Sequence, residues 1–169
     1  MLVRPAALAR IGGIDSIRSE IIDDCALARR IKTQGPIWLG TATATYSIRE
    51  YSSWQPIWGM IARTAFAQLG YSAAMLPVTV AMMAVTYLAP PLLLLSGQTL
   101  ATALGGAAWL AMSAAYMPAV RRYRCALPWV LLLPAAALFY TAATIASAVL
   151  FWRGRGGMWK GRFQAGARG

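Results

Sequence analysis

The sequence predicts a mainly α-helical membrane protein with a small α/β segment, an interfacial helix and about three transmembrane helices. Of the 169 residues, 59% are hydrophobic and 12% are charged, whereas soluble domains average about 45–50% apolar and about 25% charged residues. Residues 64–120 and 125–152 contain no Asp, Glu, Lys or Arg. A soluble protein must keep its surface solvated, so charge-free stretches of this length indicate contact with lipid.

Residues 1–53 form the first unit, which we expect to be a small α/β segment. After the Gly12-Gly13 break, Asp15 can cap a helix whose apolar residues recur at three- and four-residue spacing and which Gly35-Pro36 ends. The β-branched and aromatic residues from Ile37 to Tyr46 are typical of a strand. About fifty residues bury too little surface to fold alone, so a partner domain or the membrane should order this segment.

Residues 54–71 predict an amphipathic helix at the membrane surface. Its apolar residues recur at helical spacing and form one stripe: Trp54, Ile57, Trp58, Ile61, Ala65 and Leu69. Gln55, Arg63 and Gln68 lie elsewhere on the helical wheel. Tryptophans beside a membrane segment suit the headgroup region. A soluble amphipathic helix packed on a core is the alternative.

Residues 72–152 form the transmembrane region, with hydrophobic runs at about 73–95, 99–120 and 126–151. Each run can cross the roughly 30 Å hydrocarbon layer, which takes about 20 helical residues. Pro90-Pro91 should bend or end the first helix near the far surface. Small residues in the second run allow close helix packing. Residues 153–169 follow as a basic, glycine-rich tail.

The formal net charge of +11 raises the question of nucleic-acid binding, but the positions of the basic residues favour lipid. They flank the hydrophobic runs, where Lys and Arg interact with anionic headgroups and set topology. The loop at 121–124 and the tail at 153–169 both favour the cytoplasm, yet three complete spans place them on opposite sides. The side of the tail therefore stays open, and we expect a cytoplasmic N-terminal segment and the bilayer as partner, without nucleic acid.

The inventory of ionisable residues limits the possible chemistry. All five acidic residues precede the first hydrophobic run, and the sequence contains no His. A His-Cys zinc site and a Ser-His-Asp triad are therefore excluded. The hydrophobic runs hold no acid or base that could carry protons or ions, which argues against a transporter or pump.

The chemical candidate is the acidic pair Asp23-Asp24. Adjacent helical residues point about 100° apart, so one carboxylate can face a pocket while the other faces solvent or an arginine. A carboxylate held near a hydroxyl can act as a general base. On spacing alone the pair is more often a solvated or capping feature of a helix start.

The Gly12-Gly13 turn, followed by a helix that carries Asp23-Asp24 and ends in basic residues, resembles the acceptor-side half of family-2 inverting glycosyltransferases. The resemblance implies that residues 1–53 are a remnant of a GT-A-type catalytic domain. It makes Asp24 the general base that deprotonates the acceptor hydroxyl, with Asp23 in support. It also implies a nucleotide-sugar donor, a lipid acceptor, and Mg²⁺ or Mn²⁺ in the full-length family.

Two further stretches narrow the resemblance. Residues 57–66 and 152–162 resemble more particularly the hopanoid-biosynthesis-associated (hopene-associated) glycosyltransferases of bacteria. This implies a multi-pass protein of the bacterial inner (cell) membrane and a hopanoid-related acceptor.

The sequence departs from the family pattern in two ways. It contains no Asp-x-Asp metal motif, which belongs to the nucleotide-binding half that should precede these residues. It also lacks a full Gln-x-x-Arg-Trp element, whose nearest counterpart is Arg63, a candidate for binding the diphosphate. We therefore expect a truncated or split enzyme that is inactive alone, with its donor-binding half made as a separate chain or missing. The alternative is a non-enzymatic small polytopic membrane anchor or partner subunit.

Overall fold

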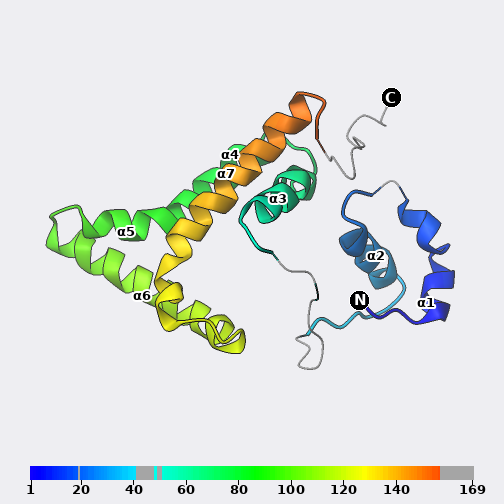
Figure 1. The fold of residues 1–169 in the computed structure, drawn as a ribbon, viewed down its shortest axis with the longest axis horizontal. Coiled ribbons are helices and arrows are strands. Elements are labelled where there is room, and N and C mark those ends of the chain that lie inside the picture. The colour runs from blue at the N-terminus through cyan, green and yellow to red at the C-terminus, as the bar shows by residue number, and fades with distance from the viewer. Residues whose placement is uncertain (19, 41–47, 49–50, 157–169) are drawn as a thin grey trace.

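The computed structural model describes residues 1–18, 20–40, 48 and 51–156. In these ranges the chain forms helices and no strand. The part before the hydrophobic runs holds four helices: α1 (Pro5–Arg10), the 3-10 helix η1 (Ile14–Ile17), α2 (Asp23–Lys32) and α3 (Gln55–Gln68). Figure 1 shows α1 and α2 lying apart from the long helices that follow.

The α/β character predicted for the N-terminal segment is wrong for the part of the chain that the structure describes. Residues 37–40 are not in a strand, and the remainder of the predicted strand, from Thr41 to Tyr46, lies outside the described residues. A strand needs a neighbour to bond its backbone N–H and C=O groups. The side chains of Trp38 and Leu39 are instead 85% and 97% exposed, so no sheet covers them.

The helix predicted to begin at Asp15 is also corrected, because it begins at Asp23. The backbone around Asp15 forms the short 3-10 helix η1, in which the Ser16 hydroxyl donates to the Gly13 carbonyl at 2.8 Å. Two adjacent β-branched residues, Ile21 and Ile22, then precede α2 and disfavour continuation of a helix. This shift places the acidic pair in the first turn of α2 rather than in its middle.

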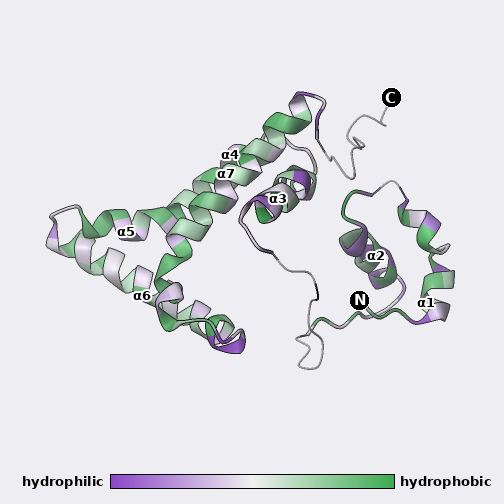
Figure 2. Cartoon of the chain, viewed as in Figure 1, coloured by the Kyte–Doolittle hydropathy of each residue, from purple (hydrophilic) through white to green (hydrophobic). Residues whose placement is uncertain are grey.

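Among the described residues, three helices are long and apolar enough to cross a membrane: Met75–Leu94, Thr99–Arg122 and Leu127–Trp152. The first consists of α4 (Met75–Met83), the π-helix η2 (Ala84–Leu88) and α5 (Ala89–Leu94), and the second is α6 (Thr99–Arg122). The third joins the 3-10 helix η3 (Leu127–Leu132) to α7 (Leu133–Trp152). Figure 2 shows hydrophobic residues along these helices and hydrophilic residues concentrated in α1, α2 and the helix ends.

The core lies where α3, α4 and α7 meet. Phe66, Leu76 and Ala148 are buried there. Figure 1 shows α4 and α7 side by side, while α5 and α6 diverge from them as a hairpin. The bend between α4 and α5 coincides with η2 and with Pro90-Pro91, which agrees with the expected effect of proline within a helix.

Helix α3 runs beside α7 in the same direction. The Trp58 and Phe139 ring centroids lie 5.3 Å apart, and those of Phe66 and Phe151 lie 5.4 Å apart, so contacts advance together along both helices. Between them, the buried backbone N–H of Phe66 donates to Ser147 Oγ at 3.1 Å. The amphipathic stripe of α3 therefore packs on α7, which belongs to the third candidate membrane span. The position of α3 at the bilayer surface stays a prediction.

Gly105 sets the approach of α5 to α6. A Cβ at this position would lie 2.7 Å from Leu93 Cβ and 2.7 Å from the Pro90 carbonyl oxygen. At neighbouring Gly106 the nearest atom would be Leu94 Cδ2, the end of a flexible side chain, at 3.4 Å. The close packing expected from small residues in the second run thus depends on Gly105 rather than on Gly106.

The Gly105→Ala substitution should destabilise the α5–α6 hairpin by about 1–3 kcal/mol, the usual cost of overpacking. Gly106→Ala is the matched control, because alanine fits there and raises helix propensity by up to about 1 kcal/mol. Thermal unfolding of the purified protein in detergent should show a lower Tm for Gly105→Ala and an unchanged or higher Tm for Gly106→Ala. Equal stability of the two variants would contradict the packing role of Gly105.

Ser147→Ala should loosen α3 from α7, because the buried hydrogen bond from the Phe66 N–H to Ser147 Oγ is lost at a cost of about 1 kcal/mol. Hydrogen–deuterium exchange should then be about fivefold faster for the Phe66 amide. Thr144→Ala is the control, since the Thr144 hydroxyl donates to the Tyr140 carbonyl of its own helix at 2.8 Å. The idea fails if both variants change the exchange of α3 equally.

Candidate functional site

The N-terminal site is built by the turn that ends α1. Gly12 and Gly13 have φ values of +83° and +76°, which glycine adopts at little cost. The Gly13 N–H donates to the Leu8 carbonyl at 3.0 Å and closes the helix end. The chain then enters η1, where Ile17 is buried, and returns as α2, where Ala26 is buried. Packing of η1 on α2 thus fixes the helix start that carries the acidic pair.

Asp23 and Asp24 occupy the first turn of α2, and both are exposed. Asp23 Oδ1 accepts a hydrogen bond from the Asp24 N–H at 2.9 Å, and Asp24 Oδ1 accepts one from the Cys25 N–H at 2.7 Å. The carboxylates therefore bind free amide groups of the helix start, where negative charge interacts favourably with the helix dipole. This is the capping role considered from the sequence, and it leaves the Asp24 carboxylate accessible to a substrate.

Arg63 lies on α3 and is partly buried. In the part of the chain that the structure describes, α2 packs against η1 whereas α3 packs against α7. Asp24 and Arg63 thus belong to separate packing units, which Figure 1 shows apart from each other. The structure brings Asp23 and Asp24 together and does not join Arg63 to them.

The described residues do not fit a divalent metal. No three side chains of His, Cys, Asp or Glu gather among them, and a hard cation such as Mg²⁺ is usually bound by one or two carboxylates together with substrate phosphates. One oxygen of each of the Asp23 and Asp24 carboxylates accepts a backbone amide, and Glu50 lies outside the described ranges.

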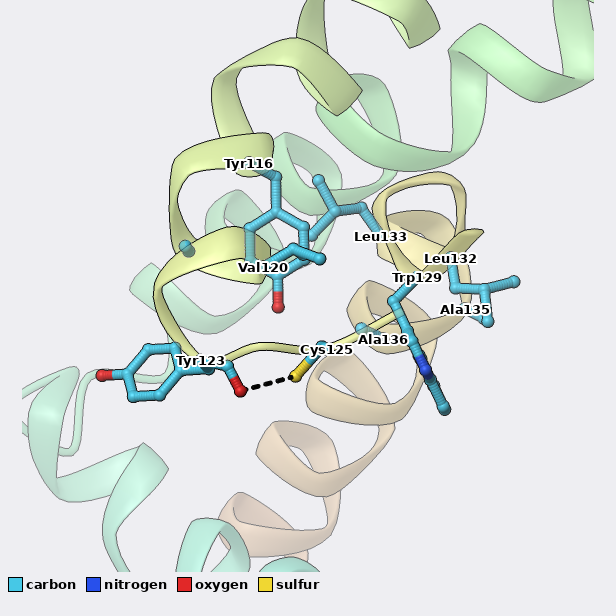
Figure 3. Close-up of a pocket in the computed structure, with 10 residues that line it drawn as sticks. Tyr116, Val120, Tyr123, Cys125, Trp129, Leu132, Leu133, Ala135 and Ala136 are labelled. Atoms are coloured by element: carbon cyan, nitrogen blue, oxygen red, sulfur yellow. Dashed lines mark hydrogen bonds between the residues drawn. The ribbon is translucent and has the colours of Figure 1, made fainter. Parts of the chain in front are cut away.

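A cavity of about 450 Å³ lies between the C-terminal part of α6 and the η3–α7 segment. Its lining is mainly apolar and aromatic, and it includes Tyr116, Val120, Tyr123, Cys125, Trp129 and Leu133. Figure 3 shows Tyr116 and Val120 of α6 facing Leu133, with Trp129 beyond them. The indole N–H of Trp109 donates to the Leu131 carbonyl at 3.2 Å and holds η3 against α6.

The sequence prediction missed this cavity because it treated residues 126–151 as one continuous span. The structure instead begins this span with a 3-10 helix that contains Pro128 and that α7 follows directly from Leu133. Pro128 was the available signal, because it lies five residues before α7 begins at Leu133 and is followed by Trp129. A 3-10 helix has a different rise and side-chain spacing from an α-helix, so the segment leaves room beside α6.

The comparisons with known proteins identify the family. The family model described as Glycosyl transferase family 21 matches residues 1–160, which is most of the chain. No match is found among curated proteins or among solved structures. The match confirms the prediction of a glycosyltransferase family, while it does not show the hopanoid-associated assignment. The chain belongs to glycosyl transferase family 21.

Proposed function

We propose that this chain supplies the acceptor side of a membrane-bound inverting glycosyltransferase that transfers a sugar from a nucleotide-sugar to a lipid hydroxyl. Family membership over residues 1–160 is the observation that supports glycosyl transfer. The three helices long and apolar enough to cross a membrane support a lipid acceptor, because such an acceptor presents its hydroxyl at the bilayer surface.

Asp24 is the general base in this proposal. The acceptor O–H proton passes to the Asp24 carboxylate, and the acceptor oxygen bonds to the anomeric carbon. The bond from that carbon to the nucleoside diphosphate breaks at the same time, which inverts the anomeric centre. The accessible position of Asp24 at a helix start suits this role, and its bond to the Cys25 N–H holds the carboxylate in place.

Asp23 and Arg63 take supporting roles. Asp23 orients the first turn of α2 by accepting the Asp24 N–H. Arg63 would bind the diphosphate, since a guanidinium matches phosphate oxygens. This second role requires α3 and α2 to approach each other when a donor-binding half is present, because the two helices pack separately in this structure.

The finer assignment follows the resemblance. Residues 57–66 and 152–162 favour a hopanoid-related lipid as acceptor and the bacterial inner membrane as location, with the N-terminal segment in the cytoplasm. Mg²⁺ or Mn²⁺ would bind to carboxylates of the donor-binding half rather than to residues described here.

A reconstitution assay tests the proposal. Membranes that contain this chain are incubated with radiolabelled nucleotide-sugar and a bacterial lipid extract, either alone or with the donor-binding half of a family-21 enzyme. The chain alone should give no labelled lipid, because its sequence has no Asp-x-Asp motif. With the donor half, Asp24→Asn should lower turnover about 100-fold or more, which is the scale of general-base catalysis.

Asp23→Asn is the matched control and should lower turnover by much less, since an amide oxygen can still accept the Asp24 N–H. Equal losses in both variants would refute the specific role of Asp24. Turnover by the chain alone would refute the need for a donor half. Absence of transfer in both arms, with an intact family-21 enzyme active in parallel, would favour the membrane-anchor alternative.

A further inference from the structure

Four helices in the described residues end in the same hydrogen-bonded turn. After α6 the N–H of Cys125 donates to the Val120 carbonyl at 3.0 Å. The hydrogen bond closes a turn of six residues, and the residue before the donor has the left-handed conformation. This is the Schellman motif. The left-handed residue is glycine at three of these ends: Gly12 after α1, Gly70 after α3 and Gly154 after α7.

Among these four turns the end of α6 is the exception, because the residue enclosed by its bond is Arg124 with φ +53°. Tyr71, with φ +58°, is also left-handed, but it follows Gly70 and its ring stacks on Phe151 with the centroids 4.5 Å apart. This conformation is disfavoured for residues that carry a Cβ, and glycine avoids the penalty. The helix dipole does not explain an arginine at position 124, since Arg121 and Arg122 in the last turn of α6 already interact favourably with it. The strained arginine therefore points to a ligand at this turn.

The apolar cavity lies at the same turn. Arg121 directly follows the lining residue Val120, and Arg124 lies between the lining residues Tyr123 and Cys125. The volume of about 450 Å³ lies within the usual range of ligand pockets, about 300–1,000 Å³. An apolar cavity whose lining residues are flanked in the chain by arginines is complementary in chemistry to an amphiphile that has an anionic head.

The exposed aromatic residues indicate the depth of the cavity in the bilayer. Tyr123 is 76% exposed and Trp129 is 58% exposed. Both line the cavity, Tyr123 directly after α6 and Trp129 within η3. Tyr and Trp are enriched at the level of lipid headgroups. A lipid whose phosphate lies at this level would place its acyl chain against the apolar wall formed by Val120 and Leu133.

We propose that the cavity between α6 and the η3–α7 segment is a binding site for an anionic phospholipid, with one acyl chain in the cavity and the phosphate on Arg121 and Arg124. This site goes beyond the proposed transfer reaction and does not depend on it. The lipid would hold α6 against the start of α7, where the cavity otherwise separates the two elements.

Fluorescence quenching tests this proposal in phosphatidylcholine nanodiscs. Phosphatidylglycerol with brominated acyl chains should quench a saturable part of the tryptophan emission, because Trp129 lines the cavity. Trp129→Phe should remove that saturable part. Brominated phosphatidylcholine should give only non-saturating quenching, and inorganic phosphate, which has the charge without the chain, should not displace the brominated phosphatidylglycerol.

Arginine variants provide the sharpest comparison. Arg124→Gly keeps the turn, as glycine does after α1, α3 and α7, and removes one guanidinium. It should weaken phosphatidylglycerol binding about fivefold, the usual contribution of one basic residue near an anionic lipid, and Arg121→Gln should do the same. Arg153→Gln, at the exposed end of α7 away from the cavity, is the control and should change binding less than twofold.

Several outcomes would overturn the proposal. Equal weakening by Arg153→Gln and Arg124→Gly would show general attraction of anionic lipid without a site. Persistence of the saturable quenching in Trp129→Phe would place the lipid elsewhere. Displacement by inorganic phosphate would make the site an anion site rather than a lipid site. Thermal unfolding of Arg124→Gly should show an unchanged or higher Tm, which separates lost binding from lost folding.

Discussion

The structure depends on the need to bond every backbone N–H and C=O group within segments that carry no charge. In a lipid environment this need is met by helices, since each helix satisfies its own backbone. The three long helices have this character, and their exposed Leu, Val and Met side chains suit contact with acyl chains. Helix ends are then the places where backbone groups must find other partners, and the Schellman turns after α3, α6 and α7 supply them.

Helix α7 connects the membrane-type helices to the segment before them. Its residues Ala143 and Ala148 are fully buried, and these small side chains allow neighbouring helices to approach. Ser147 supplies a polar contact to α3 in the same stretch.

The sequence predicted the three long helices and the amphipathic α3 well, because charge-free length and helical periodicity are strong local signals. It predicted the start of α2 poorly, since the Ser16–Gly13 hydrogen bond and the Ile21-Ile22 pair decide that boundary and neither changes the periodic pattern. The strand prediction failed at Ile37–Leu39 because a strand depends on a neighbour elsewhere in the protein. Asp23-Asp24 stays a prediction from its motif. The cavity beside α6 was missed because it depends on a 3-10 segment that hydropathy does not distinguish from an α-helix.

The two proposed sites use charge in opposite ways, and the helix ends explain the difference. Asp23 and Asp24 lie at the N-terminal end of α2, where free amide groups attract negative charge and hold the carboxylates through short bonds. Arg121 and Arg124 lie at the C-terminal end of α6, where free carbonyl groups attract positive charge. Attraction to the helix dipole explains both the position of Asp24 and that of Arg121. It does not explain a left-handed arginine at the turn position where three other helix ends have glycine. The strain at Arg124 is thus the feature that distinguishes a lipid-binding turn from an ordinary basic loop.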